Sequence, residues 1–251
     1  PGSLGVDISI GGPPDGAGPL RCVLQPTPGA SNTTPAYFAS SMPEVSITPA
    51  GGVQSGPPLV SCACATPAAD IRYTLDGSAP PAASPLYAAP FLLSSSAVVR
   101  ARAFIAGELP GPVATRTYLI DESPALPVVC LSTDSAYLWD DDIGIYVEGN
   151  GDALGGYPSN PIEPPANYWE DWERPVHLEL YEPGGGGFGI DAGVKMSGKS
   201  TRKLPQKSFA LFMRDRYRAD ELVYDLFPGL GITRFTAFKL RNAGSDNSSR
   251  Y

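Results

Sequence analysis

Short alternating runs of apolar and polar residues dominate the chain between residues 43 and 120. Successive side chains of a β-strand point to opposite faces, so such alternation indicates half-buried strands. The runs lie at residues 44–48, 59–65, 71–75, 91–93, 97–104 and 114–120. The dipeptide Asp76-Gly77 closes one of them and is typical of a tight turn. About seven short strands at this spacing predict a small β-sandwich.

A second β-rich region follows a short polar hinge at residues 121–124. Ser132-Thr133-Asp134 can cap a brief helix that carries residues 136–139. We expect strands at residues 176–182, 188–196, 208–212 and 235–240. Residues 183–187, a proline and four glycines, lie between two expected strands and predict a hairpin turn. They do not predict a nucleotide-binding loop, because no helix follows them. Residues 148–167 read as a long loop and residues 220–229 as a short turn or helix.

Composition agrees with a mainly β chain. Glycine and proline, 28 residues each among 251, exceed a fifth of the sequence, which suits short strands joined by turns. Residues 1–42 are rich in Gly, Pro, Ser and Thr and read as a linker. No run of 18 apolar residues occurs, so we expect no membrane span.

The residue types that most often carry metal or redox chemistry are sparse. The spacing of the four cysteines fits neither a zinc site nor a redox Cys-x-x-Cys motif, and we interpret them as small buried hydrophobic residues (Cys22, Cys62, Cys64 and Cys130). A disulfide from Cys22 to Cys62 or Cys64 is the alternative. The single His177 excludes a multi-histidine metal site, and its place in an alternating strand indicates a structural role.

Two other groups of side chains permit two readings each. The three carboxylates of residues 140–142 are read as a solvated acidic loop rather than a calcium site, because they lack the spacing of a calcium loop. Tyr73, Tyr87 and Tyr118 are candidates for stacking on a sugar, and tyrosines of this kind are also typical of sandwich cores.

The charge pattern singles out Gly193–Arg218. This stretch holds eight of the 18 Lys and Arg residues and one acid, Asp215, in a chain of net charge −8. A strand, a Gly/Ser turn and a second strand that opens on Lys207 form an arrangement suited to phosphate oxygens, since turn amides and a lysine both attract anions. The alternative is a solvated basic face that protects a strand edge.

The segments 198–202, 204–209 and 241–246 (GKSTR, LPQKSF and RNAGSD) resemble the N-terminal part of the CotH (spore coat protein H) kinase-like family. Residues 126–132 resemble that family's opening strand, and 143–146 and 176–181 fit the same pattern. The resemblance covers about half of the chain. It implies an N-lobe in which Lys207 contacts phosphate and the turn supplies the remaining nucleotide-binding residues, Gly198, Lys199, Ser200 and Arg202.

The same resemblance limits the expected chemistry. In the family, the catalytic and metal-binding aspartates belong to a second lobe, and no segment here matches that lobe. We therefore expect no catalytic and no metal-binding residue in this chain, and ATP and Mg²⁺ as cofactors of a full-length protein only. The chain itself is expected to bind an anion or nucleotide weakly, with a contribution from Lys207, and to show no phosphoryl transfer.

Two further resemblances concern the N-terminal half. Residues 71–80 (IRYTLDGSAP), with Leu86-Tyr87 and residues 98–103, resemble the chitobiase/β-hexosaminidase C-terminal domain, a non-catalytic immunoglobulin-like module of secreted bacterial proteins. Residues 25–32 (QPTPGASN), with Pro14-Asp15-Gly16, resemble the end of a bacterial lamin-tail domain. A proline-rich linker is the alternative for that segment.

These observations give one domain map and two function classes. The predicted fold is an immunoglobulin-like sandwich at 43–120, after a linker or lamin-tail end at 1–42, followed by a β-rich (α+β) partial kinase-like N-lobe at 126–251. The first function is a fragment of a secreted, cell-surface bacterial protein with a CotH-like kinase N-lobe, inactive as it stands. The second is a structural extracellular β-module protein for adhesion, coat or filament assembly. Its expected partners are neighbouring modules or other copies, with carbohydrate as a weaker expectation and no nucleic acid.

Overall fold

The computed structural model describes residues 9–12, 21–23, 31, 37–38, 41–155 and 163–242. The fold is mainly β, which confirms the predicted class. The chain divides into two compact units. The first comprises Pro1–Ser132 and Glu179–Phe188, and the second comprises Thr133–Leu178 and Gly189–Tyr251. No helix within the described residues has the length and apolarity needed to cross a membrane.

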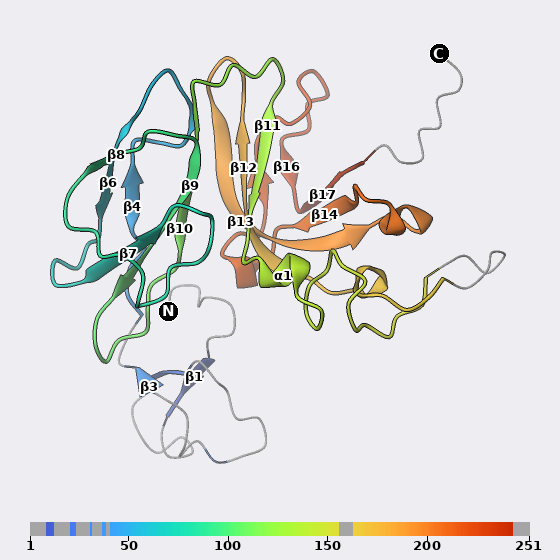
Figure 1. Ribbon diagram of the computed structural model, residues 1–251, viewed down its shortest axis with the longest axis horizontal. Helices are drawn as coiled ribbons and strands as arrows, with labels where there is room; N and C mark the ends of the chain where they lie inside the picture. The colour runs from blue at the N-terminus through green and yellow to red at the C-terminus, as the bar shows by residue number, and fades with distance from the viewer. Residues whose placement is uncertain are drawn as a thin grey trace. The chain divides into compact units, whose positions relative to one another are not determined.

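The first unit contains a two-sheet sandwich, as predicted. Its strands are β4 (Ser46–Thr48), β5 (Gly52–Gln54), β6 (Leu59–Ala63), β7 (Asp70–Thr74), β8 (Phe91–Leu92), β9 (Ala97–Phe104) and β10 (Ala114–Ile120). One sheet has the order β5-β10-β9-β7 and the other β4-β6-β8 (Figure 1). Strand β7 pairs with β9 and not with the next strand in sequence, because β8 joins the opposite sheet.

Alternation along β9 builds the core of this sandwich. Val99, Ala101 and Ala103 are fully buried, and so is Val60 of the facing sheet. Removing one valine-sized side chain from water contributes about 1.5–3 kcal/mol, so this apolar face is a main source of stability. Tyr118 of β10 is also fully buried, and burial raises the pKa of its hydroxyl to about 12. Tyr118 therefore belongs to the core and offers no surface on which a sugar could stack.

The Asp76-Gly77 turn forms where the sequence predicts it. Gly77 has φ +82°, a left-handed conformation that glycine adopts without strain. The Asp76 carboxylate accepts hydrogen bonds from the Ser78 hydroxyl (2.7 Å) and amide (3.0 Å). These bonds hold the pKa of Asp76 below its ordinary value.

Two parts of the first unit differ from expectation. Strand β5 was not predicted, and it pairs in parallel with β10. Within the segment read as a linker, β1 (Ser9–Gly11), β2 (Arg21–Val23) and β3 (Tyr37–Phe38) form an antiparallel sheet of order β1-β2-β3. The residues that carry the lamin-tail resemblance, 14–16, 25–30 and 32, lie outside the described residues, and Ser31 alone is described.

A buried carboxylate links β10 to the segment Glu179–Phe188 within the first unit. Glu179 is 2% exposed and accepts hydrogen bonds from the Thr117 amide (3.1 Å), the Thr117 hydroxyl (2.5 Å) and the Tyr181 hydroxyl (2.6 Å). The Tyr181 ring lies where side chains at Gly51 and Gly52 would project. A buried charge is tolerated when its oxygens are fully hydrogen-bonded, as here.

The second unit combines strands with short helices. Its elements, some of them shared with the first unit, are α1 (Ala136–Trp139), η1 (Asn167–Trp169), β12 (Arg174–Tyr181), β13 (Gly187–Ser197), η2 (Ser200–Lys203), β14 (Ser208–Phe212), η3 (Asp215–Tyr217), β15 (Leu222–Val223), β16 (Arg234–Phe235) and β17 (Ala237–Leu240). With β11 (Val128–Ser132), the long strands follow the sheet order β11-β12-β13-β14-β17. That this unit is a kinase-like lobe stays a prediction, and so do the boundaries of the three-part domain map.

The predicted helix at 136–139 is α1, and the glycine turn joins β12 to β13. Residues 220–229 match the expected turn or helix only in part, since a turn forms at Pro228-Gly229. Leu222 and Val223 form β15, which pairs antiparallel with β16. The isolated apolar side chains of this segment fit a two-residue strand as well as a helical turn, so periodicity alone could not decide between them.

Candidate functional site

The Gly/Ser turn of the basic stretch joins β13 to β14. The two strands pair antiparallel from Gly193↔Phe212 to Ser197↔Ser208, and η2 lies in the connection. Gly198 opens the turn with φ +98°, and a Cβ there would collide with the Thr201 hydroxyl. The positive φ favours glycine at this position, and a larger residue would also displace the Thr201 hydroxyl.

Lys207, the predicted phosphate contact, is enclosed by its own unit. Only 8% of the residue is exposed, and its ammonium group donates to the Leu204 carbonyl at 2.9 Å. The same group lies 4.4 Å from the ring centroid of Tyr168 and 5.2 Å from that of Tyr146. Burial lowers the pKa of Lys207, and nearby Glu148 opposes that shift. A cation between two aromatic faces is attracted to both by their quadrupoles.

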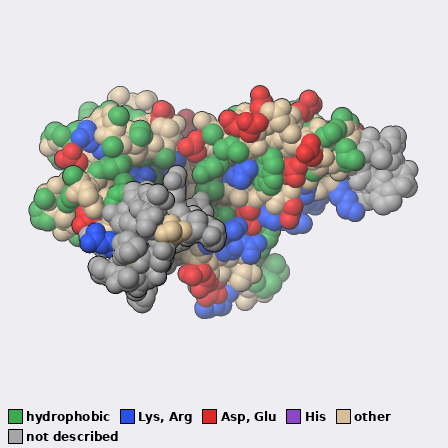
Figure 2. Space-filling view, turned by 90° about the horizontal axis from the view of Figure 1, so that it is seen from below, with side chains coloured by type: hydrophobic (Ala, Val, Ile, Leu, Met, Phe, Trp, Pro, Cys, Tyr) green, Lys and Arg blue, Asp and Glu red, His purple; other side chains and the backbone are tan. Residues whose placement is uncertain are grey.

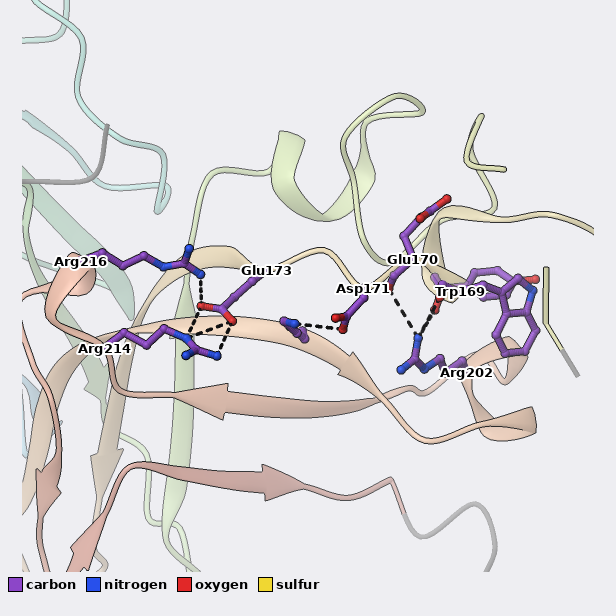
Figure 3. Close-up of polar contacts among 9 residues, drawn as sticks. Trp169, Glu170, Asp171, Glu173, Arg202, Arg214 and Arg216 are labelled. Carbon is purple, nitrogen blue, oxygen red and sulfur yellow. Dashed lines mark hydrogen bonds and ion pairs between the residues drawn. The ribbon is translucent and has the colours of Figure 1, made fainter. Parts of the chain in front are cut away.

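Arg202 is also held by backbone oxygens. Its Nε donates to the Gly198 carbonyl at 2.9 Å, and Nη1 donates to the carbonyls of Trp169 (3.2 Å) and Tyr168 (3.3 Å). Figure 3 shows this guanidinium pointing at the backbone of the 169–170 segment. Burial lowers the pKa of Arg202. The side chain thus fixes the turn to the segment that also supplies the Tyr168 ring.

The predicted site residues lie on or next to the same turn, but they differ in their exposure and in their contacts. Gly198, Lys199 and Ser200 are exposed on the turn. Arg202 and Lys207 are joined through a shared neighbour, since Tyr168 gives its carbonyl to the first and its ring to the second. Nucleotide binding by these five residues stays a prediction.

The other cations of the basic stretch pair with carboxylates that lie elsewhere in the sequence. Lys195 contacts Asp171 (2.9 Å), Lys203 contacts Glu163 (2.5 Å) and Arg218 contacts Asp191 (3.4 Å). On the face drawn in Figure 2, basic and acidic side chains likewise occur next to one another. Much of the local positive charge is therefore balanced within the unit.

Glu173 is the most buried carboxylate among these pairs. Its side chain is 7% exposed and accepts hydrogen bonds from Arg214, whose Nε lies at 3.0 Å, and from Arg216. Both guanidinium groups converge on it in Figure 3. A Cβ at Gly193 would collide with the Glu173 carboxylate, so glycine makes room for it. Burial alone would raise the pKa of Glu173, but hydrogen bonds from the two arginines outweigh it and keep the pKa below its ordinary value.

An open pocket of about 480 Å³ lies around this cluster. We call it the basic basin, and its lining residues are Asp171, Trp172, Glu173, Arg174, Lys195, Arg214 and Arg216. Four cations and two carboxylates give it a formal charge of +2. It is separate from the enclosed ammonium group of Lys207, which does not line it.

Sequence reasoning missed several residues that organise this unit. Asn167 is fully buried, donates to the Asp141 and Gly144 carbonyls (both 2.9 Å), and accepts from the Gly151 amide. The Tyr146 hydroxyl donates to the Pro205 carbonyl at 2.9 Å and accepts from the Lys207 amide. The only sequence signal for these roles was the cluster of aromatic and polar residues in otherwise irregular segments.

The remaining candidates have structural surroundings. All four cysteines are free thiols, so no bond joins Cys22 to Cys62 or Cys64. His177 contacts Asp191 through Nδ1 at 2.6 Å. The Asp140 carboxylate accepts the amides of Asp142 and Ile143. Within the described parts of the chain, no three His, Cys, Asp or Glu side chains are grouped as a metal site requires.

Comparison with known proteins identifies one region. Residues 49–115 match the family model of the chitobiase/beta-hexosaminidase C-terminal domain, in agreement with the resemblance inferred from residues 71–103. This segment contains β5 to β9 and the start of β10. No curated protein matches the chain. The CotH-like and lamin-tail resemblances receive no support from these comparisons.

Proposed function

We propose that the chain is a structural part of a secreted, modular bacterial surface protein. In this proposal, a non-catalytic sandwich at 43–120 precedes a β-rich unit whose basic hairpin stabilises its own fold. The family match at 49–115 supports the accessory character of the first module, and domains of that family are typical of extracellular proteins. Adhesion, coat or filament assembly through neighbouring modules or further copies is the role that follows.

The observation that carries the structural role is the environment of Lys207. Its ammonium group already has a carbonyl acceptor and two aromatic faces, and the residue is 8% exposed. An incoming phosphate would have to displace these contacts to reach the charge. Arg202 likewise uses Nε on the Gly198 carbonyl and Nη1 on the carbonyls of residues 168–170.

A nucleotide cradle of the CotH type is the second candidate. It is favoured by the Gly198 turn between paired strands and by the position of Lys207 directly before β14, which is the order of elements that the resemblance implies. In this alternative, the contacts of Lys207 and Arg202 hold the cradle ready in the absence of ligand. ATP and Mg²⁺ are then the cofactors of the full-length protein.

Thermal unfolding with and without Mg-ATP separates the two candidates, because a ligand that binds only the folded state raises the unfolding temperature. The structural role predicts that Lys207→Met lowers this temperature and that any change caused by Mg-ATP is the same in the wild type and in Lys207→Met. Lys239→Met is the matched control, since Lys239 is an exposed lysine of β17 in the same sheet. A saturable rise in the wild type that Lys207→Met abolishes and Lys239→Met retains would overturn the structural role and establish the cradle.

A further inference from the structure

We propose that the basic basin binds a small multivalent oxyanion, of the polycarboxylate or phosphate class. This inference does not depend on the function proposed for the Lys207 hairpin. It begins with the charge balance, in which four cationic side chains face two carboxylates around an open volume of about 480 Å³. A volume of this size lies within the range of small-molecule pockets, roughly 300–1,000 Å³.

The two arginines of the basin are held in fixed positions by a carboxylate that a ligand cannot readily replace. Glu173 is 7% exposed at its side chain, while Arg214 and Arg216 are 45% and 54% exposed. Arg214 uses Nε and Nη2 on Glu173. A guanidinium carries five N–H donors in a planar fork, so the remaining donors of both side chains can face a ligand. The single carboxylate of Glu173 thus holds two guanidinium groups in position but balances only one of their two positive charges.

The other carboxylate is poorly protected. The Asp171 side chain is 87% exposed and contacts Lys195 at 2.9 Å, while Lys195 itself is 20% exposed. Exposed ion pairs of this kind contribute little to stability, about 0–1 kcal/mol. A multivalent anion that also reaches the arginines can therefore take the place of Asp171 beside Lys195.

Arg174 is a further cation of the basin whose guanidinium group is held by contacts within the unit. The Arg174 guanidinium lies 5.0 Å from the ring centroid of Trp172, and its Nε donates to the Ile143 carbonyl at 2.8 Å. Burial lowers the pKa of Arg174, but arginine remains charged at neutral pH. Cations held in place before the ligand arrives bind it with a smaller entropic penalty. Planar guanidinium groups also match carboxylate and phosphate oxygens in bidentate geometry.

The test is an NMR titration of the whole chain with citrate and, separately, with inorganic phosphate. The signals of the Arg214 and Arg216 Nε–H groups are followed at constant ionic strength, because screening alone weakens exposed charges. Saturable shifts with either anion are expected. Stronger binding of citrate would indicate a polycarboxylate ligand, and stronger binding of phosphate a phosphorylated one.

Three variants make the test specific. Arg216→Gln should weaken binding about tenfold, as expected for the loss of one charge-assisted contact. Asp171→Asn should strengthen it by up to about fivefold by removing the competing carboxylate, since an exposed ion pair is worth at most about 1 kcal/mol. Arg234→Gln is the matched control, because Arg234 is also an exposed arginine (67%, against 54% for Arg216) and pairs with Glu221 outside the basin. Absence of saturable shifts with both anions, or equal binding by wild type and Arg216→Gln, would refute the proposal.

A failure of the basin proposal can be distinguished from a failure of the proposed structural function of the Lys207 hairpin. Binding in the basin must persist in Lys207→Met, because Lys207 does not line the basin. Binding that Lys207→Met removes and Arg216→Gln leaves intact would assign the anion to the hairpin instead and overturn the basin.

Discussion

Replacing Glu179 by alanine should destabilise the first unit by about 3 kcal/mol. The change leaves the Thr117 amide, the Thr117 hydroxyl and the Tyr181 hydroxyl without their common acceptor in a site where Glu179 is 2% exposed. An unsatisfied buried donor costs about 1–3 kcal/mol, which gives roughly 3–9 kcal/mol for the three. Relief of the desolvation of the carboxylate, several kcal/mol, offsets part of this sum.

The expected decrease in unfolding temperature is roughly 6–12 °C, since 1 kcal/mol corresponds to about 2–4 °C in a chain of this size. Glu179→Gln keeps one acceptor oxygen and the side-chain volume, so it should cost only about 1 kcal/mol. Glu122→Ala, an exposed carboxylate of the same unit, should stay within about 0.5 kcal/mol of the wild type. Equal stability of the Glu179→Ala and Glu122→Ala proteins in thermal and urea unfolding would refute the reasoning.

A local probe of the same carboxylate is available in the thiol of Cys130. Burial, and secondly the charge of Glu179, raise the pKa of this thiol, while a hydrogen bond with Thr117 lowers it. Glu179→Gln removes the charge and should therefore lower the pKa of Cys130. The pH dependence of thiol labelling measures this shift. An unchanged or higher pKa in the variant would contradict the assigned electrostatic contact.

Two further outcomes follow from the second unit. The pKa of Glu173 in the folded state lies below the ordinary 4.5. The ionised carboxylate therefore stabilises the fold above pH 4.5, and this stabilisation is lost as the pH falls through the folded-state pKa. Unfolding temperatures between pH 7 and 3 should accordingly decline less steeply in Glu173→Gln than in the wild type. Gly198→Ala should cost about 1–3 kcal/mol in urea unfolding, and more than Gly186→Ala, because Gly186 has a similar φ of +100° with no atom near its missing Cβ. Equal costs for the two glycines would show that the contact at Gly198 is unimportant.

The elements that could be predicted are those whose signal lies within a few neighbouring residues of the sequence. Strand β9 was recognised because apolar and polar residues alternate from Val99 to Ala103, and α1 because a capping sequence precedes four apolar residues. Strand β5 was missed since its three residues, Gly-Val-Gln, show no pattern of their own. Its partner is β10, more than 60 residues away, and only the tertiary fold brings the two together.

The candidate site divides in the same way. Glycine at 198 and the cations around it could be predicted, because turn chemistry and local charge are visible in a single segment. The rings that enclose Lys207 could not, since Tyr146 comes from a loop and Tyr168 from the short helix η1, 61 and 39 positions earlier. Periodicity assigns residues to faces of an element and contains no information about which distant side chain meets which.

Ion pairs with carboxylates that are distant in the sequence also account for a basic stretch in an acidic chain. Lys203, Lys195 and Arg214 pair with carboxylates 40, 24 and 41 positions earlier, all within residues 163–173. Folding therefore places the stretch against an acidic segment, whose carboxylates Glu163, Asp171 and Glu173 balance part of its positive charge. A run of cations indicates an external anion only where its charge exceeds that of the segment packed against it. In the basic basin, three cations of the stretch and Arg174 face two carboxylates, which gives a formal charge of +2. The contacts of Lys207, by contrast, are one carbonyl and two neutral rings. An anion is thus attracted to the exposed, partly compensated arginines more readily than to the most deeply enclosed lysine of the stretch.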